Sequence, residues 1–184
     1  MRAVQKADSR CVEKRLFLVG LITALAVAPQ AFGGHGSAGQ TSIQTLDAGV
    51  LVKLNAIRTT HGLVPLKLNA ALSAAAARHS EEMLADGYFA HESHNGAPFW
   101  KRLTGYSGPT PYGWSVGENL LWSSPGLDAS AALRTWMASP EHRKNILRPT
   151  WREIGIAAVH ANAAPGTYGG RPVTIITTDF GVRR

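Results

Sequence analysis

Four side chains in this sequence carry groups that bind metal ions or move protons, and they lie in three short segments. They are His91 in YFAHES, Glu118 in VGENL, and Glu141 with His142 in SPEHRKNIL. Imidazole and carboxylate groups are common metal ligands and proton carriers in proteins. We expect each segment to lie where a loop meets a regular element, which is where functional side chains are often placed.

Two well-known functional motifs are missing from the sequence, and two others occur outside the context that gives them their chemistry. There is no GxxxxGK run and no HExxH run. GxGxxG occurs once, as GHGSAG at 34–39, where no predicted strand precedes it, and GxSxG occurs once, as GWSVG at 113–117, where it follows a predicted loop rather than a strand. Dinucleotide and nucleoside triphosphate chemistry are therefore disfavoured. The motifs also show no Ser or Cys nucleophile beside a paired base.

The composition fits one folded domain. Of the 184 residues, 45% are apolar and 17% are charged, which excludes a disordered polyelectrolyte and a polytopic membrane protein. The net charge of +7 alone would favour a nucleic-acid partner. Much of that charge lies in the first 15 residues, however, so we do not expect nucleic acid as a partner.

The N-terminus resembles a secretory signal. Five basic residues precede an apolar run at 16–28, which is shorter than the ~20 residues of a membrane span. We therefore predict a signal peptide over 1–33 and no stable membrane anchor after its cleavage. The remaining fourteen basic and ten acidic side chains give a net charge of +4. Because Cys11 would leave with the signal, we expect a disulfide-free monomer in the periplasm or the medium.

Apolar spacing and capping residues predict the elements of the remaining chain. Residues 34–42 are small and polar, which indicates a flexible lead-in to a domain over 43–184. The predicted helices are one along Leu46–Ile57 that ends near 61–62, one capped by Asn69 that ends near Gly87, a short one over 98–103, and one after Asp128 that closes at 139–140. Residues 105–115 read as a loop, and 154–160 and 173–180 as strands joined by a turn at 165–172.

The motifs, taken in order, resemble one known family. LNAIRTTHGLVPLKLNAALSAAAARHSEEM, YFAHES, GENL, W-x-x-SPEHRKNIL, EIGIAA and TDFG follow the pattern of the bacterial branch of the CAP superfamily, the SCP-like domains named after cysteine-rich secretory, antigen 5 and pathogenesis-related 1 proteins. The resemblance covers about residues 46–181. It implies an α+β fold, a three-layer α-β-α sandwich with a central, mainly antiparallel sheet.

The resemblance also implies a cleft, since CAP domains typically carry a tetrad of two His and two Glu. His91, Glu118 and His142 match three of these positions. The fourth departs from the pattern, because Ser139 stands three residues after Trp136, where eukaryotic relatives have Glu, and Glu141 is only close in sequence. The cleft residues that we expect are His91, Glu118, Ser139, Glu141 and His142.

Three functions follow from the resemblance. The first is an exported binding module, in which His91 and His142 hold a divalent metal (Zn or Ca) or the cleft takes up a small apolar or envelope-derived ligand, such as a lipid. The second is a metal-assisted, peptidase-like hydrolase with Glu118 as the general base. The third is a structural protein of the cell envelope. We favour the binding module, because few members of this fold are established catalysts.

Simpler structural roles compete with these functions. His91 and His142 could merely link loops to Glu118 and to backbone groups. His79 lies on an apolar helix face, which indicates a core histidine. Asn145 is expected to satisfy turn backbone, and the adjacent charges at 143–144 to form a solvated face. The aromatic residues between 99 and 114 could either line a groove or clamp loops onto the core.

Overall fold

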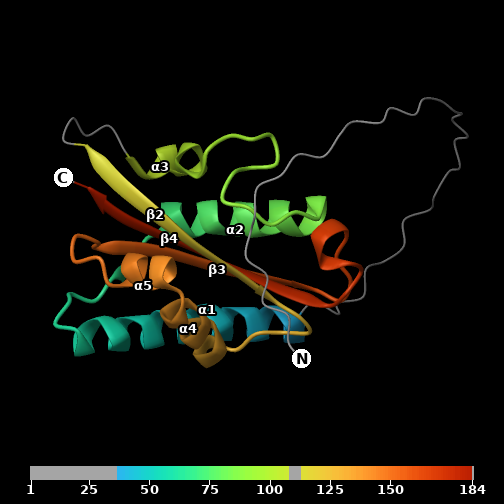
Figure 1. The fold of residues 1–184 in the computed structure, drawn as a ribbon, viewed down its shortest axis with the longest axis horizontal. Helices are drawn as coiled ribbons and strands as arrows, with labels where there is room; N and C mark the ends of the chain where they lie inside the picture. Colours follow the sequence, from blue (N-terminus) through green and yellow to red (C-terminus); the bar gives the residue numbers. More distant parts are fainter. Residues whose placement is uncertain (1–36, 108–112, 184) are drawn as a thin grey trace, which may run out of the picture.

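The sheet of this protein is enclosed by helices on both faces, as a computed structural model of residues 37–107 and 113–183 shows (Figure 1). The predicted signal peptide with Cys11, and part of the predicted loop, lie outside these residues. The elements in order are α1 (Ser37–Thr60), β1 (Lys67–Leu68), α2 (Ala70–Asp86), η1 (Phe99–Leu103), α3 (Thr104–Ser107), β2 (Trp114–Ser123), α4 (Ala129–Ala138), α5 (Pro140–Ile146), β3 (Glu153–Ala161), η2 (Gly166–Tyr168) and β4 (Val173–Arg183).

The four strands form one sheet in the order β1-β3-β4-β2. The short β1 runs parallel to β3, and the two other pairs are antiparallel. Figure 1 shows α2 on one side of the sheet and α1, α4 and α5 on the other. The predicted α+β class and mainly antiparallel sheet are therefore confirmed, and β2 is an edge strand.

Alternation along the strands decides which side chains meet which helices. Ile154 and Ile156 belong to the core cluster that includes residues of α1 and α4. Gly155, between them, faces α2, where a Cβ atom would lie 2.1 Å from the backbone of Leu72. A side chain at this position would therefore push α2 away from the sheet.

The caps predicted from the sequence are confirmed. The Asn69 side chain accepts hydrogen bonds from the N–H groups of Ala71 and Leu72, and Gly87 ends α2 in the left-handed conformation. The Asp128 side chain caps α4 through the N–H of Ala131.

The interior positions of two predicted helices are also confirmed. Trp136 is fully buried, and its indole N–H donates to the carbonyl of Leu120 at 3.1 Å. His79 is fully buried too, as expected of a core histidine.

Several expectations about the elements were wrong. The lead-in expected over 34–42 is helical from Ser37 onward, because extending an existing helix is far easier than starting one. Thr104–Ser107 forms α3 at the start of the predicted loop, and α5 follows α4 directly. Strand β2 was not predicted. Glu118 lies within this strand and His142 within α5, rather than where loops meet regular elements.

No helix among residues 37–107 and 113–183 is long and apolar enough to cross a lipid bilayer.

Candidate functional site

His91 lies in the segment that follows α2, and the buried ring of His79 supports this segment. The Nε2–H of His79 donates to the carbonyl of Ala90 at 2.9 Å, since a carbonyl only accepts. Burial lowers the pKa of His79. The negative charge of Glu118 is the largest effect that raises this pKa, and it offsets the effect of burial only in part. The buried ring is therefore a neutral support beneath the loop.

Glu118 holds His91 from the edge strand. Its side chain is 1% exposed, and its Oε1 lies 2.8 Å from Nδ1 of His91. Because a carboxylate only accepts, Nδ1 of His91 is the donor in this bond. When the ring is neutral, its other nitrogen, Nε2, keeps a lone pair for a ligand.

Arg102 of η1 ties Glu118 to the His91 loop. Its guanidinium donates to Oε2 of Glu118 at 2.6 Å, to the His91 carbonyl at 2.9 Å and to Oγ of Ser93 at 3.1 Å. The Arg102 side chain is only 11% exposed. Charge-assisted bonds of this kind are short and strong, so the arginine fixes both the carboxylate and the loop.

His142 enters the same cleft from α5. Its Nδ1 is buried and has no hydrogen-bond partner among the described residues. Burial lowers the pKa of the ring, the positive charge of a protonated His91 lowers it further, and Glu141 opposes both effects. The His142 ring is therefore kept neutral, which is the form that binds metal ions.

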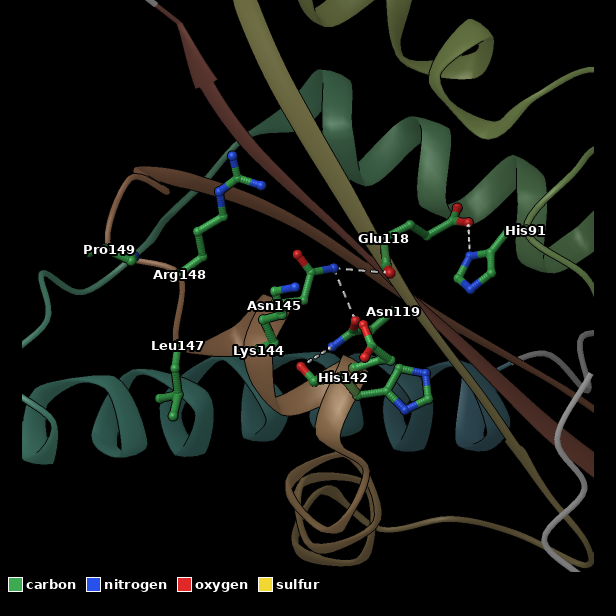
Figure 2. A pocket seen from close by; sticks show the side chains of 10 residues that line it. His91, Glu118, Asn119, His142, Lys144, Asn145, Leu147, Arg148 and Pro149 are labelled. Atoms are coloured by element: carbon green, nitrogen blue, oxygen red, sulfur yellow. Dashed lines mark hydrogen bonds and ion pairs between the residues drawn. The ribbon is translucent and has the colours of Figure 1, made fainter.

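Two asparagines build the wall between these histidines. Asn119 donates to the His142 carbonyl, and Asn145 donates to the Glu118 carbonyl and to Oδ1 of Asn119, each at 3.1 Å. Figure 2 shows this network beside the separate bond from His91 to Glu118. Gly117 allows the close approach, because a Cβ atom there would lie 2.6 Å from Oδ1 of Asn145.

The cleft that these elements enclose measures about 680 Å³. Its lining residues are His91, Glu118, Asn119, Glu141, His142, Lys144, Asn145, Leu147, Arg148 and Pro149. The structure thus brings together four of the five expected cleft residues. Ser139 is not one of the lining residues and lies instead at the junction of α4 and α5, whereas Glu141 does line the cleft. Of the two candidates for the fourth tetrad position, only Glu141 lines the cleft.

Sequence reasoning missed three residues of this site. Arg102 looks like an ordinary surface arginine in the run FWKRL, and no local signal marks it. Asn119 directly follows Glu118 in the GENL motif, so its presence was visible although its role was not. Asn145 was expected only to satisfy turn backbone, and it instead links α5 to the edge strand.

A closed metal centre is not formed by the described side chains. In residues 37–107 and 113–183, no three His, Cys, Asp or Glu side chains are grouped closely enough to hold a metal ion. The site offers two imidazoles, one whose Nε2 lone pair is available and one with an unpartnered Nδ1. These two imidazoles are the side chains of the cleft that could hold a metal ion.

Comparisons with known proteins agree with the fold. The model of the family described as "CAP: Cysteine-rich secretory protein family" matches residues 51–175. The Bacillus subtilis protein YkwD is 32% identical over 125 residues, which cover 67% of this chain and 46% of that protein. The Bacillus subtilis membrane protein YlbC is 30% identical over 112 residues, which cover 61% and 31%. The chain thus spans less than half the length of either relative.

Solved structures show the same architecture. An extracellular protein containing an SCP domain from Bacillus anthracis superposes with a TM-score of 0.61 at 25% identity, covering 83% of this chain and 45% of that one. An outer surface protein from Borrelia burgdorferi gives 0.57 at 17% identity, covering 73% and 90%. The latter likeness is one of fold alone.

Proposed function

Because this chain belongs to the cysteine-rich secretory protein (CAP) family, we propose that it is an exported binding module whose cleft takes up a divalent cation and a small, envelope-derived ligand. Export is supported by the signal peptide predicted over 1–33. It is also supported by the Bacillus anthracis neighbour, which is described as extracellular. We place the protein in the periplasm or the medium.

The observation on which the proposal rests is the state of the two cleft imidazoles. Nδ1 of His142 is buried without a partner among the described residues, and a buried polar atom of this kind calls for a ligand. Nδ1 of His91 is held by Glu118, which directs Nε2 away from that bond. His91 and His142 would therefore hold the cation, and Glu118 would orient His91 as an outer carboxylate. A zinc ion bound there would supply a Lewis acid with open positions.

The rest of the lining indicates the kind of molecule that would fill those positions. Leu147 and Pro149 are the apolar residues of the lining, Lys144 and Arg148 add positive charge, and Glu118 and Glu141 add negative charge. Because Glu118 is already paired with Arg102, the two basic side chains favour a ligand that carries an anionic group, and such a ligand can also have an apolar part. A component of the bacterial envelope that carries carboxylate or phosphate groups has this chemistry.

A metal-assisted hydrolase is the second candidate, with Glu118 as its general base. Both carboxylate oxygens of Glu118 are already bonded, one to His91 and one to Arg102. A general base needs an oxygen within reach of the attacking water. For this reason we place binding before hydrolysis.

Calorimetric titration of Zn²⁺ and Ca²⁺ into the purified protein tests the proposal. We expect Zn²⁺ to bind at neutral pH, and His91→Ala and His142→Ala each to weaken binding at least about 10-fold. His160→Ala is the matched control, because this histidine is exposed on β3 and bonded to Thr174. Affinity should also fall as the pH is lowered, since protons compete for the imidazoles.

Two further results separate the candidates. Glu118→Gln should weaken Zn²⁺ modestly under the binding proposal, and it should abolish turnover of peptide or ester substrates under the hydrolase alternative. If the wild-type protein binds neither cation at neutral pH, both metal functions are overturned.

A further inference from the structure

Asp179 lies directly beside Glu118 in the sheet. The two residues are paired opposite one another in the register of β4 and β2, so their side chains project from the same face. Asp179 is completely buried, and neither of its carboxyl oxygens has a hydrogen-bond partner among the described residues. A buried acid with two unsatisfied oxygens requires an explanation.

The neighbour that could satisfy Asp179 is itself an acceptor. Glu118 is nearly fully buried, and its two oxygens accept bonds from His91 and Arg102. Two ionised carboxylates accept hydrogen bonds but donate none, so they cannot bond to each other. One added proton turns this repulsive pair into a hydrogen-bonded one.

The charges around Asp179 favour that proton. Burial and then the negative charge of Glu118 raise the pKa of Asp179 well above its usual value. The groups that oppose this rise are Arg102 of η1, which is already paired with Glu118, and Arg78 of α2. His79, on the same helix, is kept neutral by burial and adds no compensating charge.

We propose that Asp179 is a positioning residue of the cleft, which stays protonated at neutral pH and donates a hydrogen bond to Glu118. The two carboxyl groups then share one negative charge, which Arg102 balances. Glu118 is thereby held by partners from three parts of the fold, with Oε1 directed at His91. The inference rests on the proposed function only in treating the His91–Glu118 pair as the working part of the cleft.

Infrared difference spectroscopy tests the proton directly. The wild-type protein at pH 7 should show the carbonyl band of a protonated carboxylic acid, and Asp179→Asn should lose it. Asp128→Asn is the matched control. Asp128 is exposed, and the hydrogen bonds that it accepts from helix N–H groups lower its pKa, so it contributes no protonated band at pH 7. Carbon-13 NMR of the wild-type protein labelled at aspartate gives the same answer without a variant, should Asp179→Asn not fold.

The dependence of stability on pH provides a second test with a definite sign. A group whose pKa is raised in the folded state contributes stability below its ordinary pKa and loses it as the pH rises through the raised value. The stability of Asp179→Asn relative to wild type should therefore increase between pH 4 and pH 8. An Asp179 whose pKa is not raised would leave this difference nearly constant between pH 4 and pH 8 and would show no protonated band at pH 7, and either result would overturn the inference.

Zinc titration of the same variants tests the positioning role. Asp179→Asn keeps a hydrogen-bond donor and should bind Zn²⁺ within about 2-fold of wild type. Asp179→Ala removes the donor and should bind Zn²⁺ about 10-fold more weakly, which is the usual effect of losing a group that helps to hold a metal-binding histidine in place. Equal losses in both variants would contradict the positioning role. If wild type binds no Zn²⁺, the proposed function fails while the spectra still decide whether Asp179 holds the proton.

Discussion

His91 and His142 reach the same cleft from opposite faces of the sheet. His91 is bonded to Glu118, and His142 is bonded through its carbonyl to Asn119, the next residue of the edge strand. Because consecutive strand residues point to opposite faces, β2 separates the two attachment points. The spacing of the two rings is thus set by one strand rather than by two independent loops.

Arg102→Ala should destabilise the protein by about 3–5 kcal/mol, because it leaves the buried charge of Glu118 unpaired. Urea denaturation at pH 7 measures this loss. Arg183→Ala is the control, because the Arg183 side chain is 43% exposed and solvent screens its ion pair with Glu153, so its loss should be much smaller. Similar losses in both variants would mean that Arg102 is not part of a buried pair.

Gly117→Ala should cost about 1–3 kcal/mol through overpacking, because a Cβ atom would lie 2.6 Å from Asn145 and 2.9 Å from Trp151. The same substitution at Gly126, where no atom of the described residues comes within 4 Å of the added Cβ, should change stability by less than about 0.5 kcal/mol. Thermal unfolding of the two variants makes the comparison. A Gly117→Ala protein as stable as Gly126→Ala would show that the wall of the cleft is loosely packed.

Asp47→Asn should stabilise the protein above pH 6 and have little effect at pH 4. Burial raises the pKa of Asp47 to about 6, partly opposed by a backbone hydrogen bond at Ala158. A raised pKa means that wild type loses stability as the pH rises through about 6, and the variant escapes this loss. We expect a gain of about 1–2 kcal/mol at pH 8 in denaturant unfolding. A loss at pH 8 would show that the ionised carboxylate is stabilised.

Trp136→Ala should cost about 3–5 kcal/mol, because it removes a fully buried ring and its bond to Leu120. Trp100 is 46% exposed, so Trp100→Ala serves as the control and should have a much smaller effect. Chemical denaturation of both variants at pH 7 decides the matter. A Trp136→Ala midpoint close to wild type would contradict its place in the core.

The elements that could be predicted from the sequence are those whose ends are marked by local capping residues. The limits of α2 were predictable because Asn69 and Gly87 mark its two ends by their own chemistry. Glu118 was found as a site residue, yet its strand was missed because Gly, Glu and Asn are poor strand formers. That strand forms because ten consecutive residues pair with β4, which is a tertiary effect.

The geometry of the cleft depended on such tertiary effects as well. Arg102 and Asp179 meet Glu118 from distant parts of the chain, and no spacing in the sequence relates the three residues. The sequence also left the fourth cleft position open between Ser139 and Glu141. The chain continues from α4 into α5 at Ser139, which directs Glu141 rather than Ser139 into the cleft.

The bonds of Asn145 and Trp136 have a consequence for association between molecules. The carbonyls of Glu118 and Leu120, two residues apart along β2, accept these side-chain bonds. Carbonyls with this spacing lie on one edge of a strand, and exposed edges are where sheets of different molecules join. Helices α4 and α5, which carry Trp136 and Asn145, therefore block this stretch of the edge against the addition of a strand from another molecule. Loosening α5 would expose the edge and favour aggregation from sheet to sheet.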